Sequence, residues 1–88
     1  MKLDTKKQIQ NRLRRIEGQI RGLQKMVEED TYCVDIITQT SAVKRALASV
    51  EDQLLEGHLA TCVVDQMKKG QHEKATKEIL KVYSLKRS

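Results

Sequence analysis

Cys33, His58 and Cys62 form a candidate set of ligands for a soft metal ion in this 88-residue sequence. His58 and Cys62 are four residues apart, which places them on one face of a helix, about 5–6 Å from each other. Cys33 lies about 37 Å from His58 along a continuous helix. In an antiparallel dimer, however, the beginning of this helix in one chain meets its end in the other. The spacing therefore predicts a metal site that two chains share and that forms twice.

The donor atoms of these residues narrow the choice of metal. Two thiolates and one imidazole form a soft set of low coordination number, which favours Cu(I). Tetrahedral Zn²⁺ needs a fourth ligand, and Glu56 or Asp65, both close in sequence, can supply it. A purely structural interpretation also exists, with Cys62 as a small buried apolar residue and His58 at the surface. Copper is the favoured metal, and zinc is the alternative.

Apolar residues that recur three and four apart predict the helices that carry these side chains. The first helix is predicted over residues 5–29, with Asp4 or Thr5 as its N-cap. Its apolar stripe consists of Ile9, Leu13, Ile16, Ile20, Leu23 and Val27. A short last helix is predicted over residues 72–83, and the tail after it is expected to fray. Its stripe consists of Ala75, Ile79 and Val82.

The middle helix, predicted over residues 31–69, carries all three candidate ligands. Asp30 and Thr31 separate it from the first helix, Gly57 is a possible weak point within it, and Gly70 ends it. Its first stripe consists of Cys33, Ile36, Thr40, Val43, Leu47, Val50 and Leu54. A further stripe consists of Leu55, Leu59, Cys62 and Gln66. The second stripe indicates that the end of this helix faces a different or wider surface.

These patterns predict an all-α fold of three helices in a single domain, residues 1–88. No alternating pattern typical of strands occurs. The sequence has two Tyr and no Phe or Trp, so its core must be aliphatic, and a chain this small buries little surface as a monomer. Two helices joined by a short turn lie antiparallel, and a partner chain can complete a four-helix bundle. We therefore expect an antiparallel homodimer.

Charge is distributed unevenly, although the sequence as a whole has a net charge of +5. Residues 1–25 carry eight bases and two acids, residues 26–66 two bases and eight acids, and residues 67–88 seven bases and two acids. An acidic middle between basic ends argues against a disordered basic tail and for a folded protein that presents basic surfaces. A basic surface favours an anionic partner, with nucleic acid as the first candidate.

The basic residues of the first helix lie opposite its apolar stripe, as Lys7, Arg14, Arg21 and Lys25 recur at seven, seven and four. Only two acids are available there for pairing. Without a helix-turn-helix pattern or aromatic residues for base stacking, we expect binding to double-stranded DNA through charge and shape. The predicted DNA-binding residues are Lys7, Arg12, Arg14, Arg15, Arg21, Lys25, Lys44 and Arg45.

Several classes of protein are disfavoured by the sequence. No run approaches 18 apolar residues, and the charged start does not resemble a signal peptide, so we expect a cytoplasmic protein without a membrane partner. In that reducing compartment Cys33 and Cys62 are expected as thiols, not as a disulfide. A chain of this length has no room for a catalytic cleft between lobes. We expect neither an enzyme nor a small-molecule substrate.

Four runs of residues resemble the copper-sensitive operon repressor family, and together they extend over almost the whole chain. The runs are Arg12–Gly22 (RLRRIEGQIRG), Met26–Asp30 with Tyr32-Cys33, Gln39–Val43 (QTSAV), and Leu54–Leu59 (LLEGHL) followed by Cys62. Members of the wider family that sense nickel, cobalt, formaldehyde or persulfide differ at the ligand positions. The set Cys33, His58 and Cys62 is similar to that of the Cu(I) branch.

The resemblance implies an all-helical dimer of dimers that binds operator DNA without metal and dissociates when Cu(I) binds, so that copper-resistance genes are expressed. It also implies that Tyr32 and Glu78 act as outer-shell partners of the ligand histidine. The residues alone suggest simpler roles, in which Tyr32 closes a turn and Glu78 pairs with Lys74 or Lys81. The alternative functions are a persulfide- or thiol-redox-responsive repressor of the same family and a non-regulatory copper or zinc storage protein.

Overall fold

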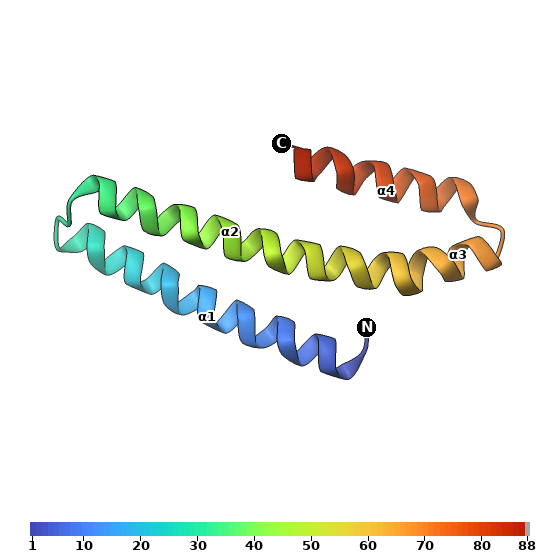
Figure 1. The fold of residues 1–88 in the computed structure, drawn as a ribbon, viewed down its shortest axis with the longest axis horizontal. Helices are drawn as coiled ribbons and strands as arrows, with labels where there is room; N and C mark the ends of the chain where they lie inside the picture. Colours follow the sequence, from blue (N-terminus) through green and yellow to red (C-terminus); the bar gives the residue numbers. More distant parts are fainter. Residues whose placement is uncertain (88) are drawn as a thin grey trace. The chain divides into compact units, whose positions relative to one another are not determined.

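The computed structural model describes residues 1–87, and regular structure in this range is entirely helical (Figure 1). The all-α prediction is confirmed. Ser88, the last residue of the predicted domain, lies outside the described residues. The elements are α1 (Leu3–Glu28), α2 (Cys33–Gly57), the π-helical segment η1 (His58–Val63), α3 (Val64–Lys68) and α4 (His72–Arg87).

The chain forms two compact units, Met1–Leu54 and Leu55–Ser88. The first unit contains α1 and nearly all of α2, and the second contains the end of α2 together with η1, α3 and α4. The single domain predicted over residues 1–88 stays a prediction, because compactness alone does not decide whether two units fold together.

In the first unit, α1 and α2 run antiparallel, side by side (Figure 1). Ile9 and Ile16 of α1 form one buried cluster with Val43 and Val50 of α2, so the two predicted stripes do face each other. Near the open end of this helix pair, the Gln53 side-chain amide donates a 2.9 Å hydrogen bond to the side-chain oxygen of Gln8. The spacing of the stripes is thus sufficient to predict how α1 packs on α2.

Only one edge of each stripe is buried in the first unit. Ile9 and Ile16 are 6% and 5% exposed, whereas Leu13, on the same stripe, is 41% exposed. The other exposed stripe residues of this unit are Ile20, Val27, Leu47 and Leu54. A shallow, mostly apolar groove lies between the helices, lined by Ile20, Leu23, Gln24, Val27, Ile36 and Thr40. One chain therefore leaves several apolar stripe residues of this unit uncovered.

The start of α1 corrects the sequence prediction. The helix begins at Leu3, not at residue 5, and its N-cap is Lys2, which makes no side-chain cap hydrogen bond. The backbone N–H of Lys6 donates to the carbonyl of Lys2 over 3.0 Å, so the first turn forms upstream of the predicted cap. Asp4 lies within that first turn, where its negative charge is favourable near the positive end of the helix dipole.

Two turns of the same type end α1 and α3. After α1, Asp30 has φ = 53°, and the backbone N–H groups of Asp30 and Thr31 donate to the carbonyls of Val27 and Met26. After α3, Gly70 has φ = 73° and the same two bonds recur. Both are Schellman motifs, in which the residue after the helix C-cap adopts a left-handed conformation. Gly70 ends the helix as predicted, while the turn after α1 delays the start of α2 from residue 31 to Cys33.

The predicted middle helix is not uniformly α-helical. Directly after Gly57, the expected weak point, the chain widens into the π-helical turn η1 before α3 continues to Lys68. The Thr61 hydroxyl donates a 2.7 Å hydrogen bond to the carbonyl of Gly57, which competes with the regular backbone ladder there. π-Helical turns are rare and occur frequently at functional sites. Both His58 and Cys62 lie in this turn.

The last helix is longer than predicted. α4 continues to Arg87 instead of ending at residue 83, so the expected fraying of the tail is wrong as far as Arg87. Leu85, Lys86 and Arg87 are good helix formers, and a cation in the last turn is favourable near the negative end of the dipole. The Arg87 guanidinium also lies 5.8 Å from the centre of the Tyr83 ring.

Candidate metal site and basic surface

His58 and Glu78 meet within the second unit. His58 is the first residue of η1, Glu78 lies on α4, and His58 Nε2 is 3.3 Å from Glu78 Oε2. Their side chains are 27% and 37% exposed. The distance allows an ion pair if the ring is protonated, yet His58 Nε2 is buried and makes no hydrogen bond. His58 and Glu78 are therefore close neighbours, but their side chains form no hydrogen bond in this conformation.

Glu78 has a second neighbour, which sequence reasoning missed. The side-chain amide of Gln66, on α3, donates a 3.0 Å hydrogen bond to the same oxygen, Oε2. Gln66 is 8% exposed and is the one buried polar residue of the described chain. The sequence did contain a signal, because Gln66 occupies an apolar position in the stripe of Leu55, Leu59 and Cys62. A polar residue at such a position calls for a hydrogen-bond partner.

The two cysteines are free thiols at the surface. Cys62 belongs to η1 together with His58, and its sulfur is 3.8 Å from the hydroxyl of Thr61. Cys33 is the first residue of α2 and belongs to the first unit, as does the 68%-exposed Tyr32. The Tyr32 carbonyl accepts the backbone N–H groups of Asp35 and Ile36, so Tyr32 is the N-cap residue directly before α2.

Among residues 1–87 no three His, Cys, Asp or Glu side chains come together in a group that could hold a metal ion. His58 and Cys62 lie in one turn, and no third side chain of these types completes a group with them in this part of the chain. Asp65, one possible fourth ligand for zinc, is engaged in a 3.1 Å ion pair with Lys69.

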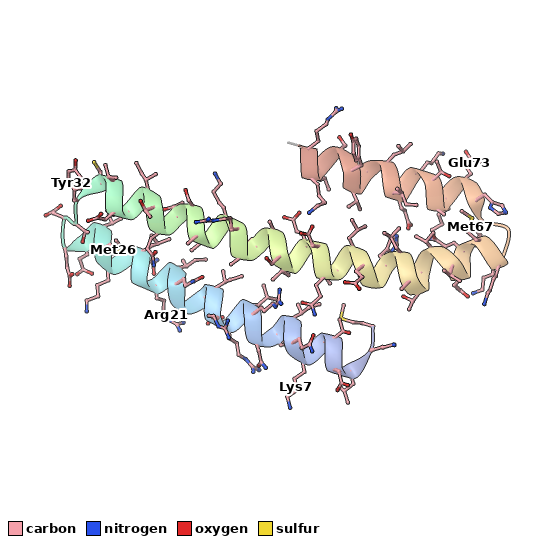
Figure 2. All side chains as sticks on the ribbon, in the orientation of Figure 1. Lys7, Arg21, Met26, Tyr32, Met67 and Glu73 are labelled. Atoms are coloured by element: carbon pink, nitrogen blue, oxygen red, sulfur yellow. The ribbon has the colours of Figure 1, made fainter. Side chains whose placement is uncertain are left out.

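The predicted DNA-binding residues of α1 are all exposed, and Lys7 and Arg21 project from α1 on the side away from α2 (Figure 2). The expectation that acids are too few to pair is wrong for Arg21, which lies 3.1 Å from Glu17. Lys25 lies 3.9 Å from Glu29, a residue of the following turn. Exposed pairs of this kind contribute about 0–1 kcal/mol, so a phosphate can replace the acid. Lys44 and Arg45 are exposed on α2.

Fold and site together define a class: a small helical protein with a histidine–carboxylate pair, two free thiols and a basic helix face. The sequence profile described as metal-sensitive transcriptional repressor matches residues 5–84, and the chain belongs to this family. The resemblance found in the sequence is thereby confirmed, and so is the prediction that the protein is not an enzyme. A repressor of transcription acts on operator DNA.

The proteins similar to this chain include two curated copper-sensing repressors and two solved structures. The copper-sensing transcriptional repressor CsoR of Bacillus subtilis is 55% identical over 78 residues, which is 89% of this chain and 77% of that protein. The copper-sensing transcriptional repressor RicR of Mycobacterium tuberculosis is 54% identical over 59 residues, 67% of this chain and 62% of that protein. The Cu(I)-containing crystal structure of the repressor CsoR from Geobacillus thermodenitrificans matches with a TM-score of 0.92 at 41% identity, over 100% of this chain and 92% of that one.

The second structure is the nickel-responsive regulator InrS, with a TM-score of 0.77 and 32% identity over 96% of this chain and 91% of that one. Proteins named for different metals thus have this same fold, so the fold does not select the metal. The ligand side chains must do so. No helix in the described part of the chain is long and apolar enough to cross a membrane.

Proposed function

We propose that this protein is a Cu(I)-responsive transcriptional repressor, which binds operator DNA without metal and dissociates when Cu(I) binds. The donor set supports copper, because two thiolates and one imidazole suit a soft ion of low coordination number. The relatives named as copper-sensing support the same metal. Release of DNA leads to expression of copper-resistance genes. As a bacterial-type regulator of transcription, the protein acts in the cytoplasm, where the DNA is.

The observation that carries the proposal is the orientation of His58. Its Nε2 is buried and faces Glu78 on α4, which leaves Nδ1 as the ring nitrogen for a metal. Cys62 supplies a thiolate from the same π-helical turn. Cys33 of a second chain supplies the other, which agrees with the lack of a three-residue group among residues 1–87 of one chain. Bound Cu(I) supplies a soft Lewis acid that fixes the imidazole in one tautomer and orientation.

A fixed ring gives a physical route from the metal site to α4. With Nδ1 engaged, Nε2 must carry the proton and becomes a donor toward Glu78 Oε2, 3.3 Å away. A coupling between metal and DNA requires a contact that differs between the two states, and this hydrogen bond is such a contact. Tyr32 of the chain that supplies Cys33 is the second proposed outer-shell partner. These contacts of His58 would change how α4 is held, and with it the affinity for DNA.

A homodimer provides the second chain. The uncovered stripe residues of α1 and α2 form the surface that a second copy can bury, completing an antiparallel four-helix bundle. Each dimer then contains two metal sites. Two such dimers form the proposed tetramer, which doubles the basic surface again. A chain of this size buries a smaller fraction of its surface on folding than a larger domain does, so burial through association adds to its stability.

The proposed DNA interface is the exposed basic face of α1 with Lys44 and Arg45 of α2. Its eight residues are repeated by the symmetry of the dimer, so that one operator meets basic faces from two or more chains. Contacts with phosphates give affinity and a strong dependence on salt. This interface needs no aromatic residue and no recognition helix.

One anaerobic titration tests the proposal. The operator is first isolated from fragmented genomic DNA by selection with the metal-free protein, and its binding is followed by fluorescence anisotropy. We expect stoichiometric Cu(I), one per chain, to release the DNA, while Zn²⁺ and a persulfide donor do not. Release by persulfide alone would identify the thiol-redox repressor, and copper binding without any selected DNA would identify a storage protein.

A further inference from the structure

Stability does not explain why a glutamine occupies the buried position 66. Its side-chain nitrogen donates to Glu78, but its side-chain oxygen is buried and makes no hydrogen bond. An unsatisfied buried acceptor is unfavourable, and an apolar side chain of the same size would avoid that cost. The remaining role for this amide is its one directed contact, the 3.0 Å hydrogen bond to Glu78 Oε2.

Glu78 needs such a contact in order to face His58. Its side chain has three rotatable bonds, is 37% exposed, and lies four residues after Lys74 and three before Lys81 on α4. Helical neighbours at these spacings form ion pairs readily. No ion pair joins Glu78 to either lysine in the described part of the chain; its two neighbours are Gln66 and His58.

We propose that Gln66 is a positioning residue, which holds the Glu78 carboxylate toward His58 Nε2 and thereby sets how strongly the metal site is coupled to DNA. This inference rests on the proposed Cu(I)-dependent release of DNA. A carboxylate oxygen accepts more than one hydrogen bond, so Oε2 can keep the Gln66 amide and also accept the His58 N–H. Without the amide, Glu78 turns toward Lys74 or Lys81, and the imidazole loses its acceptor.

The test uses Gln66→Met, which keeps the size of the side chain and removes the amide. Operator affinity is measured for the full chain without metal and with one Cu(I) per chain. We expect the ratio of the two affinities to fall toward one, by up to about tenfold, which is the size of one hydrogen bond to a charged group. One Cu(I) should still bind per chain, because no ligand is changed.

Gln53→Met is the matched control. Gln53 also donates one side-chain hydrogen bond, to Gln8 over 2.9 Å, and also has a buried oxygen without a partner. It lies in the first unit, whereas His58 and Glu78 lie in the second. If losing a side-chain amide with a buried oxygen mattered only for stability, the two variants would behave alike. We expect a wild-type affinity ratio for Gln53→Met.

A second measurement needs no metal and no DNA. In metal-free protein, the side-chain amide protons of Gln66 should exchange slowly with solvent by NMR, and Glu78→Ala should make them exchange fast. Rapid exchange in the wild type would overturn the inference. This arm keeps the inference testable if Gln66→Met does not fold.

The outcomes separate the two proposals. A wild-type protein whose operator affinity does not respond to Cu(I) overturns the proposed function, and the inference with it. A responsive wild type together with a Gln66→Met variant that keeps the full ratio overturns the inference alone. A reduced ratio in Gln66→Met, with the Gln53→Met ratio unchanged and Cu(I) binding intact, supports both.

Discussion

In the proposed mechanism, the residues of the candidate site have two separable roles, binding the metal and reporting it. The proposed thiolate ligands are Cys33 and Cys62, whereas Glu78 faces Nε2 of His58, the ring nitrogen that is not proposed to bind metal. Metal affinity and coupling are different free energies, and a change can remove one and leave the other. The proposal therefore assigns affinity to the cysteines and coupling to Glu78, Tyr32 and Gln66.

The first prediction follows from the thiolates. Cys33→Ala and Cys62→Ala should each lose most of the Cu(I) affinity, because a soft ion loses one of its two sulfur ligands. Competition with a chromophoric Cu(I) chelator measures this loss. Metal-free binding to the operator should be unchanged in both variants, since neither thiol lies on the basic face. Near-wild-type Cu(I) affinity in either variant would remove that cysteine from the site.

At this scale the sequence predicts residue types better than contacts. The spacing of His58 and Cys62 is enough to place both in one turn, which η1 confirms. The resemblance singled out Glu78, and the structure brings it to His58. The contact between Gln66 and Glu78 could not be predicted, because the two residues lie on different helices. A pattern along one helix does not reveal contacts between helices.

Among the elements, the two helix-ending turns allow a direct comparison. Both place one residue in the left-handed region, Asp30 with φ = 53° and Gly70 with φ = 73°. Glycine adopts this conformation without strain, and other residues do so at a cost of about 1 kcal/mol. The turn after α1 is thus strained at Asp30, whereas the turn after α3 is not.

The second prediction is that Asp30→Gly stabilises the protein by about 0.5–1 kcal/mol, because it removes the strain of a left-handed aspartate. Gly70→Ala should destabilise it by about 1 kcal/mol. A Cβ added at Gly70 would have no atom within 4 Å, so only the backbone conformation is affected. Urea unfolding at fixed protein concentration measures both. A destabilised Asp30→Gly variant would mean that the aspartate makes a compensating interaction.

The third prediction concerns the basic face of α1. If Arg14 and Arg21 contact phosphates, replacing either by Ala should weaken binding on all DNA sequences alike. The slope of log K against log salt should fall by about 1 for each phosphate that is no longer neutralised, and by twice that in a symmetric dimer. Lys77→Ala, at an exposed position of α4 outside the predicted set, is the control. An unchanged slope at unchanged helicity would exclude these arginines from the interface.

Periodicity predicts the elements well where helices are regular. The facing stripes of α1 and α2 and the glycine at the end of α3 follow from side-chain spacing and backbone freedom. The π-helical turn does not, because it is a change in hydrogen-bond register that apolar spacing does not encode. The start of α1 was misplaced for a related reason: the carbonyl of Lys2 begins the ladder without any side-chain cap.

For the whole molecule, the proposed function requires that two chains complete each site. The stripe residues left exposed on the first unit provide the apolar surface that a second copy can cover. Association and metal binding are then linked, since each Cu(I) joins Cys33 of one chain to His58 and Cys62 of another. A monomer should bind Cu(I) weakly and should not respond to it.

The fourth prediction tests this sharing with a mixed dimer of Cys33→Ala and Cys62→Ala chains, purified with two different affinity tags. One of its two metal sites keeps both thiols and the other site has neither, so the mixed dimer should bind one Cu(I) tightly. A dimer of either variant alone keeps a single thiol in each metal site and should bind no Cu(I) tightly. A mixed dimer without tight Cu(I) binding would show that the metal does not join the chains.

The metal signal is proposed to reach DNA through the contact between His58 and Glu78. The most direct test of this route is the operator affinity of Glu78→Ala, measured with and without Cu(I) at one metal per chain. The wild-type ratio should lie within the range of about 5- to 150-fold that is typical of allosteric coupling. For Glu78→Ala we predict that Cu(I) remains bound and the ratio falls toward one. A wild-type ratio at full metal occupancy would contradict this route, because the signal would then not pass through Glu78.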